Sequence, residues 1–398
     1  MPQTDLDQVV ITGMGVVSPI GCSEDRFWES LTTGRSGAAK IDCLDTSDLP
    51  RDTACPIREP IDIGVSLHRA SQLTVAASRQ AVSSAGLRVE DVDANRLAVI
   101  VGTTMGETDP IEHRLDDPDE RWLNPEHARI IAQGKPGSIA ANVRDDLQAV
   151  GPAVDIYGAC AAGNLALTKA RNDLLSGRCD VALAGGSDGF STLAFIGFMR
   201  LRIMSSGVCK PFDEERDGLL VGEGSAMFVL ERESSARARG VRIRARVVGC
   251  SITCEDYHPT RPDPNGDGLT RATQEALRQS GLSPDDIEYV CAHGTGTPQN
   301  DAIEVAVMQR CFPRGVAFSS IKALTGHTMG AAAAMEAACC VLSLERQTLI
   351  PTWHLSKVLQ PCELDAIKDE PREARVRYAV NNSAGFGGYN SSVVLAMA

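Results

Sequence analysis

The chain has 398 residues, of which 43% are hydrophobic and 23% charged, a balance typical of a soluble globular protein with a large core. Its formal net charge of −13 argues against nucleic acid as a partner, because phosphate backbones select basic surfaces. The polar N-terminus is unlike a signal peptide, and the most apolar helical stretch, 331–344, is too short to span a membrane. The 13 irregularly spaced cysteines include no C-x-x-C pair, so we expect no metal site, no disulfide framework and a reducing cytoplasm.

Apolar runs and helical patterns alternate along the chain, which is typical of an α/β fold. Strands are expected at 8–13, 97–102, 154–157, 180–184, 224–230, 243–248 and 289–292, and helices at 25–33, 73–85, 164–176 and 331–344. Loops are expected at 37–65, which is rich in Pro and Asp, and at 210–219. A charged segment at about 107–135 is expected to leave the core as an excursion.

A faint internal repeat predicts two halves, 1–240 and 241–398. The helix end at 81–87 and its following strand have counterparts at 276–282 and 289–292, about half a chain later. The same logic pairs Cys160 with His327, so that both would meet at the centre as equivalent helix N-termini. A chance match between Ala- and Gly-rich helices is the alternative.

Cys160 follows an apolar run and a two-residue turn, and it opens a helical segment. Free backbone N–H groups at such a junction favour an anion, so we expect a depressed pKa and a nucleophilic thiolate. The alternative is a buried cysteine that acts as a small hydrophobic residue.

Polar residues of three further segments also suggest a catalytic site. His293 and His327 sit in Gly/Thr-rich turns just after apolar strands, where loops commonly carry catalytic groups. Lys322 ends the strand before His327, and the glycine turn 385–388 allows backbone N–H groups to approach a ligand. Taken singly, each has a plain alternative: a structural histidine, a solvated lysine or a simple hairpin.

Together these segments resemble the elongating β-ketoacyl-acyl carrier protein synthases, type II ketosynthases of the thiolase superfamily. The resemblance extends over nearly the whole chain and includes Val9-Val-Ile-Thr-Gly-Met-Gly15, Pro211-Phe-Asp213, Arg216-Asp-Gly218 and Gly222-Glu-Gly224. It implies the thiolase fold, in which two pseudo-symmetric βα halves form a five-layered αβαβα sandwich, usually as a dimer.

The resemblance also implies a decarboxylative Claisen condensation. Cys160 would take an acyl group from a carrier protein, and His293 and His327 would promote loss of CO₂ from malonyl on a second carrier protein. Lys322 would orient the second histidine, His327, through its hydrogen-bond network, and the N–H groups of Cys160 and Phe386 would form the oxyanion hole. The product would be a β-ketoacyl chain two carbons longer, with no cofactor beyond the phosphopantetheine of acyl carrier protein.

Further positions take implied roles from the family. Thr295 and Thr297 would bind the pantetheine arm, Phe386 would gate the acyl and malonyl pockets, and Met105 would limit the acyl pocket. Glu336 would be the buried structural acid, although an exposed helix charge is the alternative. Ala384 replaces the phenylalanine of the usual Ser-Phe-Gly-Phe-Gly-Gly turn. This departure and the excursion favour specialised polyketide or polyene synthesis over housekeeping fatty acid synthesis.

An acidic carrier protein needs a local basic patch on this acidic chain. Arg200, Arg202 and Lys210 are close in sequence, and Arg69 is expected to join them; an ordinary solvated surface is the alternative.

Three other functions compete with an active homodimeric synthase. A chain-length-factor-like subunit in a heterodimer would usually lack the nucleophile. A thiolase that uses coenzyme A would need a second cysteine in the last glycine turn, whereas the only cysteine after Cys340 is Cys362. A cysteine hydrolase would give no reason for a second histidine and a lysine.

Overall fold

The computed structural model describes residues 7–108, 112 and 134–398, so the expected excursion at 107–135 lies almost wholly outside the described residues. The first half contains strands β1 (Val9–Val17), β4 (Leu97–Thr103), β5 (Ala153–Tyr157), β6 (Val181–Asp188) and β7 (Gly224–Arg232). Its helices are α1 (Glu24–Thr33), α2 (Arg69–Ser84), α5 (Ser138–Asp146), α6 (Ala162–Leu175), α7 (Thr192–Arg200) and α8 (Glu233–Arg239). The expected strands and helices of this half are confirmed, with shifted ends; α5, α7 and α8 were not predicted.

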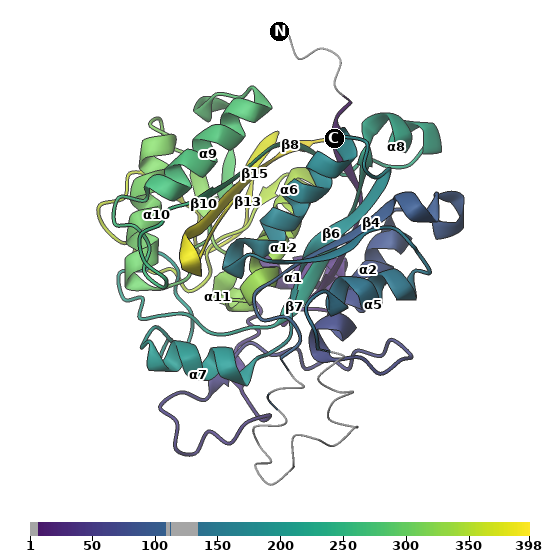
Figure 1. Ribbon diagram of the computed structural model, residues 1–398. Coiled ribbons are helices and arrows are strands. Elements are labelled where there is room, and N and C mark those ends of the chain that lie inside the picture. Colours follow the sequence, from purple (N-terminus) through teal and green to yellow (C-terminus); the bar gives the residue numbers. More distant parts are fainter. Residues whose placement is uncertain (1–6, 109–111, 113–133) are drawn as a thin grey trace.

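The second half repeats this plan (Figure 1). Its strands are β8 (Ala245–Cys254), β9 (Tyr289–Cys291), β10 (Ala317–Ser319), β12 (Asp365–Ala366), β14 (Tyr378–Gly385) and β15 (Tyr389–Met397). Its helices are α9 (Asp267–Ser280), α10 (Pro298–Cys311), α11 (Lys322–Thr325) and α12 (Ala332–Arg346). Two small antiparallel pairs, β2 (Ala39–Lys40) with β3 (Thr53–Ala54) and β11 (Thr348–Leu349) with β13 (Arg372–Glu373), complete the described strands.

The strand order demonstrates the pseudo-symmetry. The first half runs β1-β7-β6-β4-β5 and the second runs β8-β15-β14-β9-β10, with matching parallel and antiparallel neighbours. A short antiparallel contact between β1 and β8, at Val10 and Ile11, joins the two sheets into one hydrogen-bonded array. The expected division at residue 240 falls in the connection between α8 and β8.

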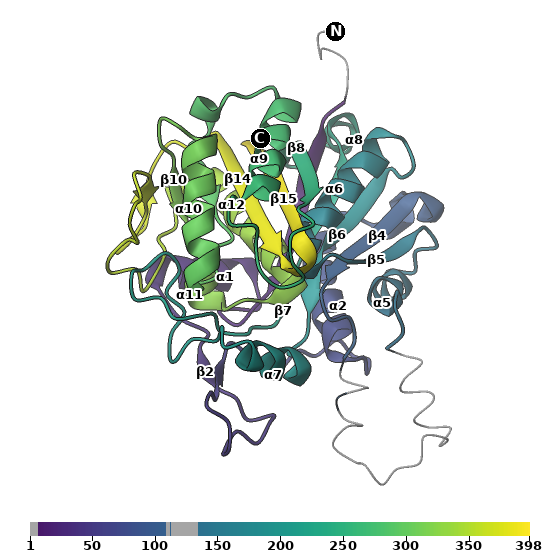
Figure 2. The same ribbon diagram turned by 60° about the vertical axis from the view of Figure 1, so that its left-hand side comes forward.

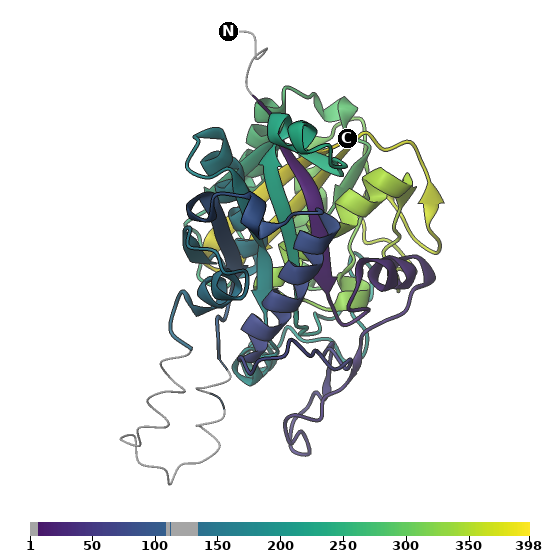
Figure 3. The ribbon, with the colours of Figure 1, turned by 90° about the vertical axis from the view of Figure 1, so that its right-hand side faces the viewer.

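Five layers result. Helices α2 and α5 cover the outer face of the first sheet, α9 and α10 cover the outer face of the second, and α6 and α12 lie between the sheets (Figures 1 and 2). Figure 3 shows α2 lying along β1 on the outer face. The expected thiolase fold is therefore confirmed. Among the described residues, no helix is long and apolar enough to cross a membrane.

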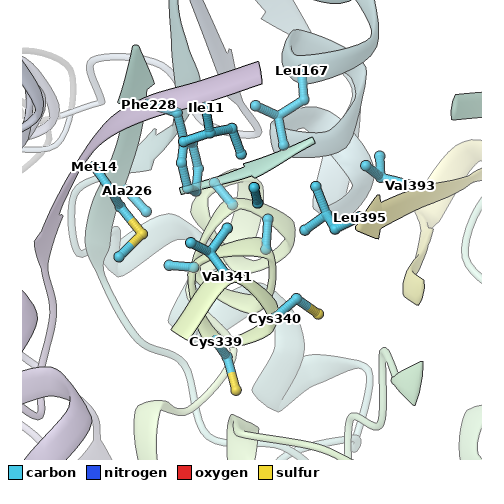
Figure 4. Close-up of a cluster of buried hydrophobic side chains, with 14 of the residues drawn as sticks. Ile11, Met14, Leu167, Ala226, Phe228, Cys339, Cys340, Val341, Val393 and Leu395 are labelled. Atoms are coloured by element: carbon cyan, nitrogen blue, oxygen red, sulfur yellow. The ribbon is translucent and has the colours of Figure 1, made fainter. Parts of the chain in front are cut away.

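Helix α12 is the centre of the core. Every residue from Ala332 to Leu344 is buried, which explains a helix that is apolar on all faces. Figure 4 shows Val341 and its neighbours among side chains from β1, β7, β15 and α6. Small residues on this helix let the two sheets and α6 approach it closely.

The closest approach joins α6 to α12 at Gly163. A Cβ on Gly163 would lie 2.6 Å from the backbone nitrogen of Ala334.

Each central helix follows a 3-10 turn, Ala159–Ala161 or Met329–Ala331, which opens on a residue with positive φ. Counted from these turns, Cys160 is equivalent to Gly330. The predicted pairing of Cys160 with His327 is therefore wrong by three residues.

We expect Gly163→Ala to destabilise the protein by about 1–3 kcal/mol, because the added methyl group overpacks the helix crossing. Gly197→Ala, in the middle of α7, is the matched control, because a Cβ there meets nothing within 4 Å. It should stabilise the helix by about 0.5–1 kcal/mol. Denaturant midpoints of the two variants measure this difference, and equal midpoints would contradict the close crossing.

Candidate functional site

A cavity of about 470 Å³ lies where the two halves meet, and it is lined by Cys160, His293 and His327. Cys160 comes from the turn before α6, His293 follows β9, and His327 follows α11. The structure thus brings together three predicted residues from segments more than 30 residues apart.

The sharp turn before α6 presents Cys160 to this cavity. Ala159 has a φ of 48°, a strained value that aims the next side chain away from the helix axis. The Ser383 hydroxyl donates to the carbonyl of Cys160 at 3.1 Å, and a Cβ on Gly385 would lie 3.0 Å from the Cys160 nitrogen. The glycine turn therefore packs directly over the start of α6.

Burial away from water has the largest effect on the pKa of the Cys160 thiol. Burial raises the pKa of Cys160 to about 12, although the Lys322 charge and the Phe386 N–H act to lower it. The expected depressed pKa is therefore wrong for the free protein, because removal of water outweighs the helix terminus. The Cys160 side chain is therefore a neutral thiol at pH 7.

The two imidazole rings lie edge to face, with centroids 5.4 Å apart. Burial lowers the pKa of both His293 and His327, and the Lys322 charge lowers each further, so both rings are neutral at pH 7. The Met329 N–H donates to Nδ1 of His327 at 3.1 Å, which leaves the proton on Nε2.

Lys322 contacts His293 and not the second histidine, His327, that it was expected to orient, and it sets the tautomer of His293. The Lys322 ammonium lies 3.3 Å from Nδ1 of His293 and also donates to the His293 carbonyl. Because an ammonium group only donates, Nδ1 must accept and Nε2 carries the proton. The Ser383 hydroxyl is a second neighbour of Nδ1, at 3.3 Å.

Glu336 compensates this buried cation. Its carboxylate contacts the Lys322 ammonium, and both side chains are 1% exposed. Burial raises the pKa of Glu336, and the adjacent Lys322 opposes that rise. The position expected from the family is thus found buried, and the alternative of an exposed helix charge is wrong.

Sequence reasoning missed two acids behind the His293 loop, Asp301 and Glu304 on α10. Glu304 accepts the backbone N–H groups of His293 and Gly294 at 2.6 and 2.7 Å. Asp301 accepts the Thr295 N–H at 3.0 Å and holds the same loop from its other end. Two acids three residues apart just after a Gly/Thr-rich loop were the available signal, because that spacing puts them on one helix face.

The outer part of the cavity is lined by Thr295 and Thr297, whose hydroxyl oxygens are 2.8 Å apart. Ala384 and Phe386 also line it, and the Phe386 ring packs against Phe198 of α7 with centroids 5.7 Å apart. Met105 does not line this cavity. It packs instead in the apolar cluster that also holds Phe198 and Phe386, two residues that do line the cavity.

The predicted basic patch is only partly assembled. Arg200 and Arg202 are exposed at the end of α7, and Arg202 lines the cavity mouth together with Arg261, which was not predicted. Lys210 is 3.7 Å from Glu215. Arg69 does not belong to the patch, because its guanidinium group pairs with the buried carboxylate of Glu223.

The raised pKa predicts how Cys160 reacts with iodoacetamide. Alkylation should accelerate by about tenfold per pH unit between pH 7 and 9, because only the thiolate reacts and its fraction is still small. Peptide mass spectrometry measures the rate, with the exposed Cys254 as an internal reference. A plateau below pH 8 would show that the helix terminus governs this thiol.

Comparison with known proteins agrees with this geometry. Residues 6–236 match the beta-ketoacyl synthase N-terminal domain, and residues 244–356 match its C-terminal domain. The chain is 35% identical to 3-oxoacyl-[acyl-carrier-protein] synthase 2 of Staphylococcus aureus (strain N315), over 97% of each chain.

Two solved structures are also similar. The ishigamide ketosynthase/chain length factor has a TM-score of 0.94 and 35% identity, covering 99% of this chain and 100% of that one. A type II ketosynthase bound to a hexaketide, in complex with its acyl-carrier protein (AntDE:AntF), has a TM-score of 0.91 and 27% identity, with the same coverage. The chain therefore belongs to the β-ketoacyl synthase family, a family of condensing enzymes of the acyltransferase class.

Proposed function

We propose that this protein condenses an acyl group on Cys160 with malonyl-acyl carrier protein, releasing CO₂ and a β-ketoacyl chain two carbons longer. The observation that carries the proposal is the convergence of one thiol and two neutral imidazoles, each with its proton on Nε2, in one cavity. Such donors suit an oxygen that gains negative charge, and the thiol suits acyl transfer.

In the first half-reaction, the Cys160 sulfur attacks the acyl thioester of a carrier protein. The N–H groups of Cys160 and Phe386 stabilise the oxygen of the tetrahedral intermediate. The proton of the Cys160 thiol passes to the departing pantetheine sulfur. A neutral thiol therefore supplies the proton that the leaving group needs. The acyl chain then lies toward Phe198 and the apolar cluster behind Phe386.

In the second half-reaction, the thioester oxygen of malonyl accepts from Nε2 of His293 and His327. The carboxylate leaves as CO₂, and its bonding electrons form the enolate. The enolate carbon attacks the Cys160 thioester, and the C–S bond breaks. The β-keto product remains on the carrier, and the Cys160 thiolate takes one proton from solvent to return to the neutral thiol. Neutral imidazoles stabilise the enolate oxygen without protonating it strongly, which keeps the carbon nucleophilic.

The carrier protein delivers both substrates. Its phosphopantetheine arm would pass the hydroxyl groups of Thr295 and Thr297, and no other cofactor is required. The exposed cations Arg200 and Arg202 at the mouth suit an acidic carrier, because complementary charge steers docking. Lys210 can add to this patch when it releases Glu215.

Ala384 favours a polyketide or polyene substrate. It lines the cavity beside Phe386, and a methyl group there occupies less space than the usual phenylalanine of the family. The similarity to the ishigamide and hexaketide-bound ketosynthases supports the same class of substrate.

A second candidate is a partner subunit in a heterodimer. Strand β5 lies at the end of the sheet order with half-buried side chains, and Tyr157 is 46% exposed, so this edge is suited to pairing with another chain. All four residues expected of an active synthase are present: Cys160, His293, His327 and Lys322. We therefore favour a homodimer, in which the chain that pairs at this edge is a second copy of this protein. A chain-length-factor-like subunit would use the same edge.

Intact-mass analysis tests the proposal. Wild-type protein incubated with a panel of acyl-carrier proteins should gain one acyl group, and malonyl-carrier protein added afterwards should yield a product two carbons longer. Cys160→Ala should gain no acyl mass, whereas Cys43→Ala, which removes an exposed thiol outside the cavity, should behave as wild type. The donor that loads fastest identifies the substrate.

The opposite result separates the two candidates. If no donor acylates the wild-type protein and iodoacetamide does not label Cys160, the chain is a partner subunit that needs another synthase. Acylation without elongation would instead contradict the role assigned to the two histidines.

A further inference from the structure

The last residue of β6, Asp188, is a buried carboxylate that the two half-reactions leave without a role. Its side chain is 0% exposed, and four donors surround it. One oxygen accepts the Thr103 hydroxyl at 2.6 Å and the Met105 N–H at 2.9 Å. The other accepts the Thr104 N–H at 2.8 Å and the Gly330 N–H at 2.6 Å.

These donors come from opposite halves of the molecule. Residues 103–106 form the turn after β4, whereas Gly330 belongs to the turn before α12. The two turns also touch directly, because a Cβ on Gly330 would lie 2.6 Å from backbone atoms of Thr103. Asp188 is thus a polar link across the pseudo-symmetric centre.

Each linked turn contacts residues next to a different part of the cavity. Met105 packs in the apolar cluster with Phe198 and Phe386, where the acyl chain is proposed to lie. Gly330 directly follows Met329, whose N–H donates to Nδ1 of His327. A shift of this turn would therefore move the donor that fixes the His327 tautomer.

Only a carboxylate satisfies all four donors. Asparagine offers one acceptor oxygen and would turn an NH₂ group toward two donors. A buried carboxylate is costly unless it is fully hydrogen-bonded, and here each oxygen accepts two bonds. This full use of both oxygens distinguishes Asp188 from an acid that only fills space.

We propose that Asp188 is a positioning residue, which holds the His327 turn in register with the acyl-pocket turn so that Nε2 of His327 meets the malonyl thioester oxygen. The inference rests on the proposed condensation. It places the effect of Asp188 on decarboxylation and C–C bond formation, and not on acyl transfer to Cys160.

The test compares Asp188→Asn with Asp213→Asn. Asp213 is an equally buried carboxylate with four donors, from Glu215, Ser356 and Lys357, and it does not line the cavity. In Asp188→Asn, CO₂ release and condensation should fall by about 10- to 100-fold, because small misplacements of a catalytic group have effects of this size. Single-turnover acylation of Cys160 should not fall by more than about threefold in either variant, because both keep the thiol, and loss of the Asp188 charge, which raises the pKa of Cys160, does not weaken the nucleophile.

A double-mutant cycle shows whether Asp188 acts through His327. Asp188→Asn added to His327→Ala should cost no further activity, because the group that Asp188 positions is already absent. Melting temperatures identify variants that fail to fold. Thr103→Val, which removes one of the four donors, provides a milder variant with a smaller loss in the same direction.

Two outcomes overturn the inference while leaving the proposed function intact: equal condensation by the Asp188→Asn and Asp213→Asn variants, or losses that multiply fully with His327→Ala. A wild-type protein that takes up acyl groups but never condenses would instead refute the proposed function itself.

Discussion

A buried ammonium group sets the chemistry of the whole site. Lys322 is 1% exposed, and it is held by the Glu336 carboxylate and the His293 carbonyl. Its charge, together with burial, keeps both imidazoles neutral. Because it can only donate to Nδ1 of His293, it also fixes which nitrogen carries the proton. This ion pair thus helps burial to keep both rings neutral and fixes the tautomer of His293, while the Met329 N–H fixes that of His327.

The pseudo-symmetric fold assembles a site that neither half of the chain could form alone. The first half supplies Cys160, and the second supplies both histidines and Lys322. Gly163 lets α6 approach α12 closely, and Cys160 before α6 and His327 a few residues before α12 line one cavity. Burial acts on all three side chains in this arrangement. It raises the pKa of Cys160 and lowers the pKa of both histidines, so all three are uncharged at pH 7.

Much of this site could be predicted from the sequence, because Cys160, His293 and His327 stand in small-residue turns directly after strands, and such turns carry function. The fold class followed from the resemblance and from the repeat. Other features depend on which charges become buried, and no local pattern reveals that. Arg69 resembles a surface cation but pairs with Glu223, which is distant in sequence. For the same reason, the true pKa direction of Cys160 was missed, whereas the two acids of α10 had a local signal in their three-residue spacing. The repeat was aligned three residues out of register because Ala-rich segments match equally well at several offsets.

The contacts of His293 and His327 make both rings neutral, with their protons on Nε2. Nitrogen NMR of ¹⁵N-histidine-labelled protein tests it most directly, with His293→Ala and His327→Ala variants to assign the signals. We expect two neutral rings with Nε2–H at pH 7, and protonation of both rings only below the pH at which a free imidazole protonates, since burial and Lys322 oppose a second positive charge. An imidazolium signal, or an Nδ1–H tautomer at either residue, would contradict it.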